Sequence, residues 1–260
     1  MDKIDVVIIG AGIAGITTAY YLQENFPDIT YKIIESRNDL GGTWDQMTFP
    51  GVRADNDMYT YGYSFNPWQG SIIGKGQDIK KYINHTAEKF NIKKHMLFDT
   101  RVTSLSWKND QWKTETDHTN FTSQYVICCT GSRDNKNPNL PKFKDENKYQ
   151  GKIVHTQAWG DTDYKDKNVT IIGSGCTAIT MTPSIVKKAK TVTLIQRTPG
   201  YIINIDSQEK SNRSYKTFEV LKDYFHSRLF KKSFKKKILS SDPYYDDTTT
   251  PSYDFWDQRP

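Results

Sequence analysis

The chain has 260 residues and a formal net charge of +6, with 36% hydrophobic and 25% charged residues. Its mean hydropathy of −0.73 is typical of a soluble globular protein, and its length allows one large or two modest domains. No run approaches the roughly 18 apolar residues of a membrane span. The apolar part of the first segment covers only residues 6–9, so we expect no secretory leader.

The chain contains three cysteines, and Cys128 and Cys129 are adjacent in the apolar run YVICCTG. An odd number of cysteines does not indicate a disulfide framework. We therefore expect Cys128 and Cys129 to be reduced, buried thiols of a cytoplasmic protein. The positive charge is mild and gathers in one late cluster, which does not indicate nucleic-acid binding. No metal site is predicted.

Near the N-terminus, the apolar strand VVIIG runs into a glycine-rich turn, GAGIAG, that fits the pattern G-x-G-x-x-G. In such a turn Gly10 permits a tight bend, and Gly12 lets the backbone approach a pyrophosphate. Gly15 lets the following helix pack closely on the strand. The turn predicts a dinucleotide site if a helix and a second strand follow it.

Both follow. A helix expected at residues 14–26 would direct its N-terminal amides, Ala14 among them, at the phosphates. The next strand, TYKIIE, ends in Glu35, twenty residues after Gly15. A carboxylate at that place accepts from ribose hydroxyls and repels a 2′-phosphate. The first unit therefore predicts a site for a dinucleotide without a 2′-phosphate, such as FAD or NAD.

A second copy of the turn follows the strand NVTIIG. It carries Gly173 and Gly175, with Ala178 in the position of the third glycine. The next strand, KTVTLIQR, ends in Arg197, nineteen residues after Ala178. A guanidinium offers bidentate geometry to phosphate, which favours NADP. The two units therefore predict two different dinucleotides and electron transfer between them.

The remaining patterns fit an α/β layout. We expect a helix at residues 78–90, a hairpin at residues 101–112 and a strand at residues 123–131. Residues 44–68 are rich in aromatic side chains but have little periodicity. Such a segment is a functional loop or disordered, and its tryptophans argue against disorder. The predicted fold class is α/β with two Rossmann-like dinucleotide-binding units.

The segment that follows Glu35 contains Gly42, Thr43 and Trp44 in the sequence LGGTWD. With the run FPGVRADNDMYTYGYSFNPW, it resembles class B flavoprotein monooxygenases, the family of flavin-containing and Baeyer–Villiger monooxygenases. The resemblance is strongest to the branch that includes the ethionamide-activating monooxygenases, and it implies that the glycine-rich segment lies against FAD.

Residues 149–160, YQGKIVHTQAWG, resemble the Baeyer–Villiger fingerprint F-x-G-x-x-x-H-x-x-x-W-P/D. Gly151, His155 and Trp159 stand at the matching positions. Tyr149 replaces Phe, and Gly160 replaces Pro or Asp. In the family the histidine and tryptophan couple the NADP domain to the FAD domain.

The resemblance implies an NADPH- and FAD-dependent monooxygenase. Such an enzyme inserts one oxygen atom from O2 into a ketone, or adds it to a sulfur or nitrogen centre, through a C4a-peroxyflavin. The terminal run WDQR resembles the family motif whose arginine lies over the flavin, which implies a catalytic role for Arg259. The family pattern assigns Asp55 as its acidic partner at the cofactor, and Arg53 matches a further family arginine.

The expected domains are an FAD-binding part at residues 1–147 and a partial NADP-binding part at residues 148–260, with a helical insert at about 207–241. The chain resembles only the N-terminal half of the family pattern and is incomplete relative to it. It is therefore a fragment of a longer monooxygenase, part of a split enzyme, or a truncated and catalytically incompetent dinucleotide-binding relative. A disulfide reductase would need a redox pair such as C-x-x-C, which the sequence lacks.

The run HSRLFKKSFKKKIL, at residues 226–239, has the pattern of a basic amphipathic helix. It is either a solvated helix of the insert or a site of peripheral contact with the inner face of the membrane. The expected partner is a small-molecule ketone, thioether or amine. The sequence does not identify the substrate or the oligomeric state.

Overall fold

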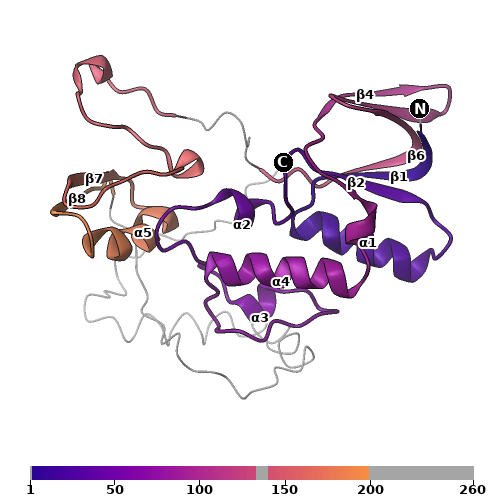
Figure 1. Cartoon of the computed structure of the whole chain (residues 1–260), viewed down its shortest axis with the longest axis horizontal. Coiled ribbons are helices and arrows are strands. Elements are labelled where there is room, and N and C mark those ends of the chain that lie inside the picture. The colour runs from indigo at the N-terminus through magenta and orange to yellow at the C-terminus, as the bar shows by residue number, and fades with distance from the viewer. Residues whose placement is uncertain (1, 133–139, 199–260) are drawn as a thin grey trace, which may run out of the picture. The chain divides into compact units, whose positions relative to one another are not determined.

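The computed structural model describes residues 2–132 and 140–198, which form two sheets, each with its own helices (Figure 1). All of these residues fall within one compact unit of the chain. The predicted insert at 207–241, the basic segment at 226–239 and Arg259 lie outside the described residues.

The first sheet has six strands in the order β3-β2-β1-β6-β5-β4. β1 pairs in parallel with β2 and β6, and β2 in parallel with β3, whereas β4, β5 and β6 are joined in an antiparallel manner. The strands are β1 (Asp2–Ile9), β2 (Tyr31–Ile34), β3 (Met96–Leu97), β4 (Val102–Lys108), β5 (Gln111–Thr116) and β6 (Asn120–Cys128). Strands β1, β2, β3 and β6 form the parallel part of the sheet. In open α/β sheets, ligands bind at the carboxyl ends of such strands.

Helices α1 (Ile13–Asn25) and α4 (Gly76–Lys89) share the main hydrophobic core with one face of this sheet (Figure 1). Alternate residues of β1 point to opposite faces, so Ile8 joins α1 and α4 while Val7 packs with Phe121 in a second cluster. Both helices were predicted, and each begins one or two residues earlier than expected.

The predicted hairpin is confirmed as β4 and β5. Its two turn residues, Asn109 and Asp110, have positive φ values of 50° and 57°. This left-handed pair matches the twist of the two strands, which is why asparagine and aspartate are favoured there.

The aromatic segment between β2 and α4 is irregular but ordered. It contains only two short helices, α2 (Thr43–Gln46) and α3 (Met58–Tyr61). Tyr63 and Trp68 are buried in the main core. Their burial explains why the segment is ordered, as its tryptophan content predicted.

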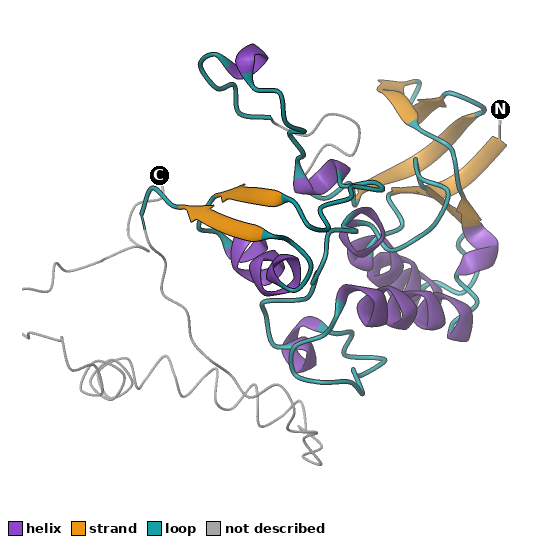
Figure 2. Cartoon of the chain, turned by 60° about the vertical axis from the view of Figure 1, so that its left-hand side comes forward, coloured by secondary structure: helices purple, strands orange, loops and turns teal. Residues whose placement is uncertain are grey.

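The second sheet consists of β7 (Asn168–Ile172) and β8 (Thr191–Ile195), paired in parallel and joined by α5 (Cys176–Val186) (Figure 2). Both strands were predicted. Ile171 packs in the cluster that contains α5 residues, while Ile172 and Ile195 remain exposed. Three short 3₁₀ helices complete the described elements, at Lys93–His95 (η1), Glu146–Lys148 (η2) and Thr156–Ala158 (η3).

The prediction of buried cysteines was wrong for Cys128, which is exposed, and Cys129 is only partly buried. The reason is their position at the carboxyl end of β6, where the strand leaves the core and borders a cavity. Both thiols are free, as is that of Cys176.

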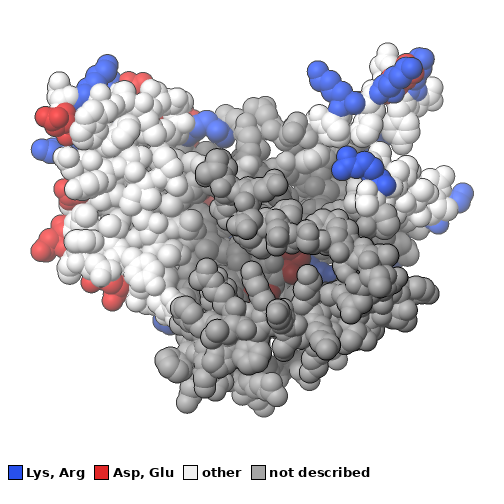
Figure 3. Space-filling view, turned by 180° about the vertical axis from the view of Figure 1, so that it is seen from behind, with Lys and Arg blue, Asp and Glu red and all other residues white. Residues whose placement is uncertain are grey.

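Acidic and basic side chains are dispersed over the described surface on the face shown in Figure 3, and they form no continuous basic patch there. Among residues 2–132 and 140–198, no helix has the length and apolarity that a bilayer crossing requires.

Candidate dinucleotide-binding sites

A cavity of about 820 Å³ opens at the carboxyl ends of the parallel strands β1, β2 and β6; we call it the first cavity. Seven residues predicted to bind the first dinucleotide line it: Gly10, Gly12, Ala14, Glu35, Gly42, Thr43 and Trp44. The sheet therefore gathers at one edge residues that are up to 34 positions apart in the sequence.

The glycines of the first turn have different structural roles. Gly10 has a φ of 108°, which residues with a side chain rarely adopt. A Cβ on Gly15 would collide with the backbone oxygen of Gly10, so this glycine serves helix–strand packing and does not line the cavity. A Cβ on Gly12 would meet only the Cα of Gly42, at 3.7 Å, and would otherwise project into free space. Gly12 is therefore the glycine that keeps the cavity open.

Glu35 directly follows β2 and is only 5% exposed, and its carboxylate joins the turn to the neighbouring loop. Its Oε2 accepts from the backbone N–H of Ala11 at 2.8 Å, and its Oε1 accepts from the backbone N–H of Arg37 at 2.9 Å. Oε1 also accepts from Ser36 Oγ at 3.3 Å, whereas Oε2 keeps a second lone pair for a ligand hydroxyl. Glu35 can thus hold the glycine turn and a ribose at the same time.

Four charged side chains next to the Gly41–Gly42 turn form a network of ion pairs, which we call the charged clamp: Arg37, Asp39, Asp45 and Lys80. The side chain of Asp45 is only 8% exposed and bridges Arg37 Nε at 2.5 Å and Lys80 Nζ at 2.6 Å. Lys80 Nζ also pairs with Asp39 at 2.8 Å. These ion pairs connect α2 and the preceding loop to α4.

Burial of Lys80 acts to lower its pKa, but its hydrogen bonds to Asp39 and Asp45 outweigh this effect and raise the pKa. Burial of Asp39 acts to raise the pKa of its carboxyl group, but the hydrogen bond and charge of Lys80 bring the pKa below its usual value. Both groups therefore stay ionised around neutral pH, and the clamp keeps its charges there.

The first cavity fits a dinucleotide through its backbone and its acid. The open backbone at Gly12 leaves room for a pyrophosphate, and the carboxylate of Glu35 suits a ribose hydroxyl. Trp44, Gln46 and Arg101 also line the cavity. Their donor atoms Trp44 Nε1, Gln46 Nε2 and Arg101 Nε are buried and have no partner among the described residues.

A second cavity, of about 660 Å³, lies between the second glycine turn and the fingerprint segment, residues 149–160. It is lined by all of the predicted turn and fingerprint positions in this part of the chain: Gly151, His155, Trp159, Gly173, Gly175 and Ala178. Gly173 has a φ of 138°, so the second turn repeats the tight bend of the first.

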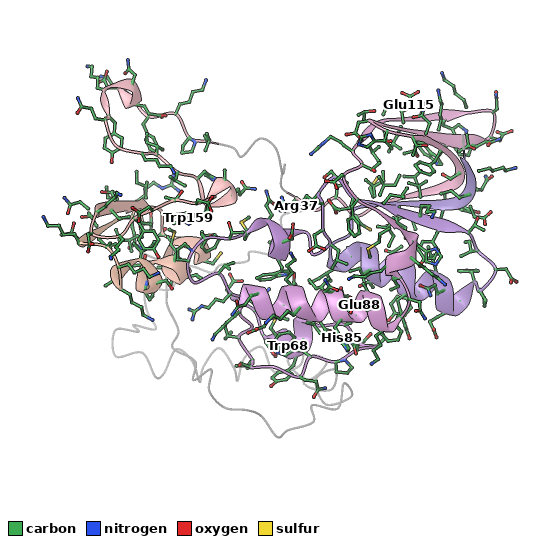
Figure 4. All side chains as sticks on the ribbon, viewed as in Figure 1. Arg37, Trp68, His85, Glu88, Glu115 and Trp159 are labelled. Carbon is green, nitrogen blue, oxygen red and sulfur yellow. The ribbon has the colours of Figure 1, made fainter. Side chains whose placement is uncertain are left out.

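The fingerprint side chains have specific contacts. Trp159 packs against the core of the second sheet and lies edge-on to Tyr164, with ring centroids 6.0 Å apart (Figure 4). His155 Nδ1 accepts from the backbone N–H of Gln157 at 3.3 Å, which begins η3. Gln157 Nε2 is a buried donor without a partner among the described residues, and it also lines this cavity.

Arg197 follows β8 at the same edge of the sheet as the second glycine turn. The backbone N–H of Gly173 donates to the carbonyl oxygen of Ile195 at 2.9 Å, two residues before Arg197. The Arg197 side chain is exposed. In the first unit the N–H of Gly10 donates to Ile34, and Glu35 is the next residue, so Arg197 lies one residue beyond the place that corresponds to Glu35.

Two of the three predicted catalytic residues lie in the described part of the chain, and neither lines the first cavity. Arg53 and Asp55 are exposed and do not line it, although the backbone of Arg53 forms a bridge with Lys75. Arg259 lies outside the described residues. The assignment of these three residues stays a prediction.

The lining residues of the first cavity that were not predicted as site residues include Gln46, Tyr61, Thr100, Arg101 and Cys128. Each reaches the cavity through the packing of its element, and none carries a local motif. Gln46 could have been found most easily from the sequence, because it lies two residues after Trp44, which was predicted to bind the cofactor.

The family model of pyridine nucleotide-disulphide oxidoreductase matches residues 4–219. The FAD-containing monooxygenase EthA of Mycobacterium tuberculosis (strain ATCC 25618 / H37Rv) is 37% identical over 225 residues, which cover 82% of this chain and 46% of that protein. The probable FAD-binding monooxygenase AlmA of Acinetobacter sp is 34% identical, with 100% of this chain and 59% of that protein covered. The chain thus spans about half the length of the curated relatives it matches.

Solved structures give the same result. An open crystal structure of cyclohexanone monooxygenase has a TM-score of 0.70 and 26% identity, covering 79% of this chain and 42% of that one. The structure of OTEMO in complex with FAD and NADP has a TM-score of 0.66 and 29% identity, covering 76% and 39%. The chain belongs to the pyridine nucleotide-disulphide oxidoreductase family, and the relatives it resembles are flavin-dependent monooxygenases.

Proposed function

We propose that the chain binds FAD in the first cavity and NADPH in the second and passes a hydride from the nicotinamide to the flavin. One observation carries this proposal: the same strand, turn and helix occur twice, with an acid directly after the second strand of the first unit and a base two residues after the second strand of the second. Glu35 follows the first β-α-β unit and Arg197 follows the second. A carboxylate favours free ribose hydroxyls, whereas a guanidinium favours a 2′-phosphate.

Within the first cavity, the chain's own residues bind and orient the cofactor. Gly12 leaves room for the pyrophosphate, and the amides at the start of α1 stabilise its charge. Glu35 accepts from the ribose, and the charged clamp holds Gly42 against the turn. FAD, when bound, supplies the two-electron chemistry that no side chain of the protein can supply.

The whole-protein reaction proposed is the transfer of one oxygen atom from O2 to a ketone or to a sulfur or nitrogen centre of a small molecule. The names of EthA, AlmA and cyclohexanone monooxygenase support this class. In this proposal, His155 and Trp159 couple the NADP-binding part, residues 148–260, to the FAD-binding part, residues 1–147.

The proposed role of Arg259 is electrostatic. Oxygen transfer develops negative charge, and a fixed guanidinium stabilises it in a site without water. Asp55 would hold that guanidinium in place, with Arg53 nearby in the sequence. The support for this assignment is the sequence motif, WDQR.

The experiment that tests the function is anaerobic mixing of the FAD-loaded chain with NADPH or NADH, followed by the flavin absorbance. We expect NADPH to remove the flavin absorbance much faster than NADH does. Equal rates for the two nucleotides would contradict the assignment of the second cavity. Bound flavin that neither nucleotide reduces would instead support a dinucleotide-binding protein without electron transfer.

A further inference from the structure

Residues 47–52, MTFPGV, directly follow α2 but pack against the second unit of the chain. Met47 and Phe49 are only 5% and 6% exposed. They belong to a hydrophobic cluster whose other buried members come from β7 and α5: Ile171, Ala178, Met181 and Ile185. A segment of the expected FAD-binding part therefore helps to form the core that supports the second glycine turn.

Both ends of residues 47–52, which we call the bridging loop, are attached to the first unit. At one end, the N–H of Met47 donates to the carbonyl oxygen of Thr43 at 2.9 Å, and Thr43 lines the first cavity. At the other end, the carbonyl oxygen of Val52 accepts from the N–H of Gly76 at 2.9 Å, where α4 begins. Because the charged clamp joins α2 to α4, the two ends are also held relative to each other.

The bridging loop contains a tight turn at Pro50 and Gly51. The N–H of Val52 donates to the carbonyl oxygen of Phe49 at 3.3 Å, which closes the turn, and Gly51 has a φ of 82°. Proline followed by a glycine with positive φ is the pattern of a type II turn. Proline restricts the backbone at its own position, so the sequence specifies the shape of this turn.

Gly51 lies directly against α5. A Cβ on Gly51 would be 2.8 Å from the carbonyl oxygen of Thr180 and 2.5 Å from Oγ of Ser184. The hydroxyl of Ser184 can rotate away, but the oxygen of Thr180 belongs to the helix backbone. Ordinary contacts of a Cβ lie at 3.4–4 Å, so only glycine lets the loop approach the helix this closely.

We propose that Gly51 is a positioning residue, whose contact with α5 sets the place of the second glycine turn relative to the first cavity. This inference rests on the proposed function, because it takes a nicotinamide and a flavin as the groups that must meet. Gly175 caps the start of α5, so a shift of the helix would carry the second turn with it. A displacement of about 1 Å far from the reacting atoms can lower a rate by roughly a hundredfold.

The test compares Gly51→Ala with a matched control, Ser184→Ala, in the FAD-loaded chain. The first variant adds a methyl group at the contact with α5, whereas the second removes an oxygen atom from the other side of the same contact. For each variant we would measure the dissociation constants of FAD and NADP⁺. Anaerobic stopped-flow absorbance would give the rate of flavin reduction at saturating NADPH.

Gly51→Ala should bind both dinucleotides as the wild type does, because it changes neither glycine turn. Its flavin should be reduced roughly ten- to a hundredfold more slowly, since the two sites are displaced from each other. Ser184→Ala should match the wild type in all three measurements.

A second variant, Ser184→Val, adds bulk to the same contact from the helix side. It leaves Gly51 and its positive φ unchanged, so strain in the turn does not contribute to its effect. It should show the same combination of normal affinities and slow flavin reduction.

A normal reduction rate in either Gly51→Ala or Ser184→Val would overturn this inference alone. A slow rate that is accompanied by an equal loss of FAD or NADP⁺ affinity would also overturn it, because a residue that only stabilises the fold would behave in this way. If NADPH does not reduce the flavin of the wild type, the proposed function fails, and this inference fails with it.

Discussion

The Oε2 atom of Glu35 accepts a hydrogen bond from the backbone N–H of Ala11, with 2.8 Å between the two atoms. This bond connects the end of β2 to the middle of the glycine turn after β1. The acid that sequence reasoning assigned to a ribose thus also holds the turn that would bind the pyrophosphate. The proposed recognition of the ribose and the stability of the glycine turn therefore depend on the same side chain.

Glu35→Ala should therefore destabilise the protein even without ligand. The change leaves the amides of Ala11 and Arg37 without their acceptor in a buried place, and losing two charge-assisted bonds costs roughly 2–4 kcal/mol of unfolding free energy. Urea denaturation measures the effect. Glu115→Ala, which removes a partly exposed acid of the β4–β5 hairpin (Figure 4) that forms an ion pair with the partly exposed Lys113, serves as the control and should leave the free energy nearly unchanged. Equal curves for Glu35→Ala and the wild type would contradict the role of the acid.

Gly12→Ala and Gly15→Ala should separate binding from folding. A methyl group on Gly12 projects into the first cavity and meets only Gly42, whereas one on Gly15 collides with the backbone of Gly10. We expect Gly12→Ala to unfold near the wild-type urea concentration but to lose FAD during purification. Gly15→Ala should unfold at a much lower concentration. A folded Gly12→Ala protein with a normal flavin content would show that the pyrophosphate lies elsewhere.

Asp39→Asn should give a pH-dependent loss of stability. The pKa of Asp39 is below its usual value in the folded state, so its contribution is present above the unfolded pKa, about 3.9, and is lost as pH falls through the folded pKa. The variant should be less stable than the wild type by about 0.2–1 kcal/mol near pH 7, since the pair with Lys80 is partly exposed. The gap should close below about pH 4 in urea denaturation. A gap that stays constant into acid would mean that the charge of Asp39 is irrelevant.

Arg197→Ala should weaken the binding of NADP⁺ about ten- to a hundredfold, because one charge-assisted contact is lost, and leave NAD⁺ binding unchanged. Equilibrium binding of both nucleotides measures this. Lys187→Ala removes an exposed cation just after α5, at the end of the helix that is remote from Gly175, and should change neither affinity. An equal loss for NADP⁺ and NAD⁺ in Arg197→Ala would show that Arg197 does not recognise the 2′-phosphate.

The parts of the fold that sequence could predict are those with short-range causes. The turn after β1 is recognisable because Gly10 and Gly15 each meet a local steric requirement, and the hairpin because Asn109 and Asp110 tolerate positive φ. The fixed length of a β-α-β unit places Glu35 at the cavity, so this long-range assignment was also accessible.

Other parts depend on packing between distant segments. The charged clamp joins Asp45 to Lys80 on a helix more than thirty residues later, and no spacing rule links the two. Cys128 belongs to an apolar run, which suggested burial, but its place at the end of β6 leaves it exposed. Gln46 reaches the first cavity only because α2 folds back over the glycine turn.

We propose that one chain holds two dinucleotides in separate sites. Equilibrium dialysis of the purified chain with FAD and NADP⁺ together tests this most directly. We expect one FAD and one NADP⁺ to be bound per chain at the same time, with Gly12→Ala losing only FAD and Arg197→Ala weakening only NADP⁺. Mutual displacement of the two ligands, or the loss of both in either variant, would show a single shared site and contradict the account.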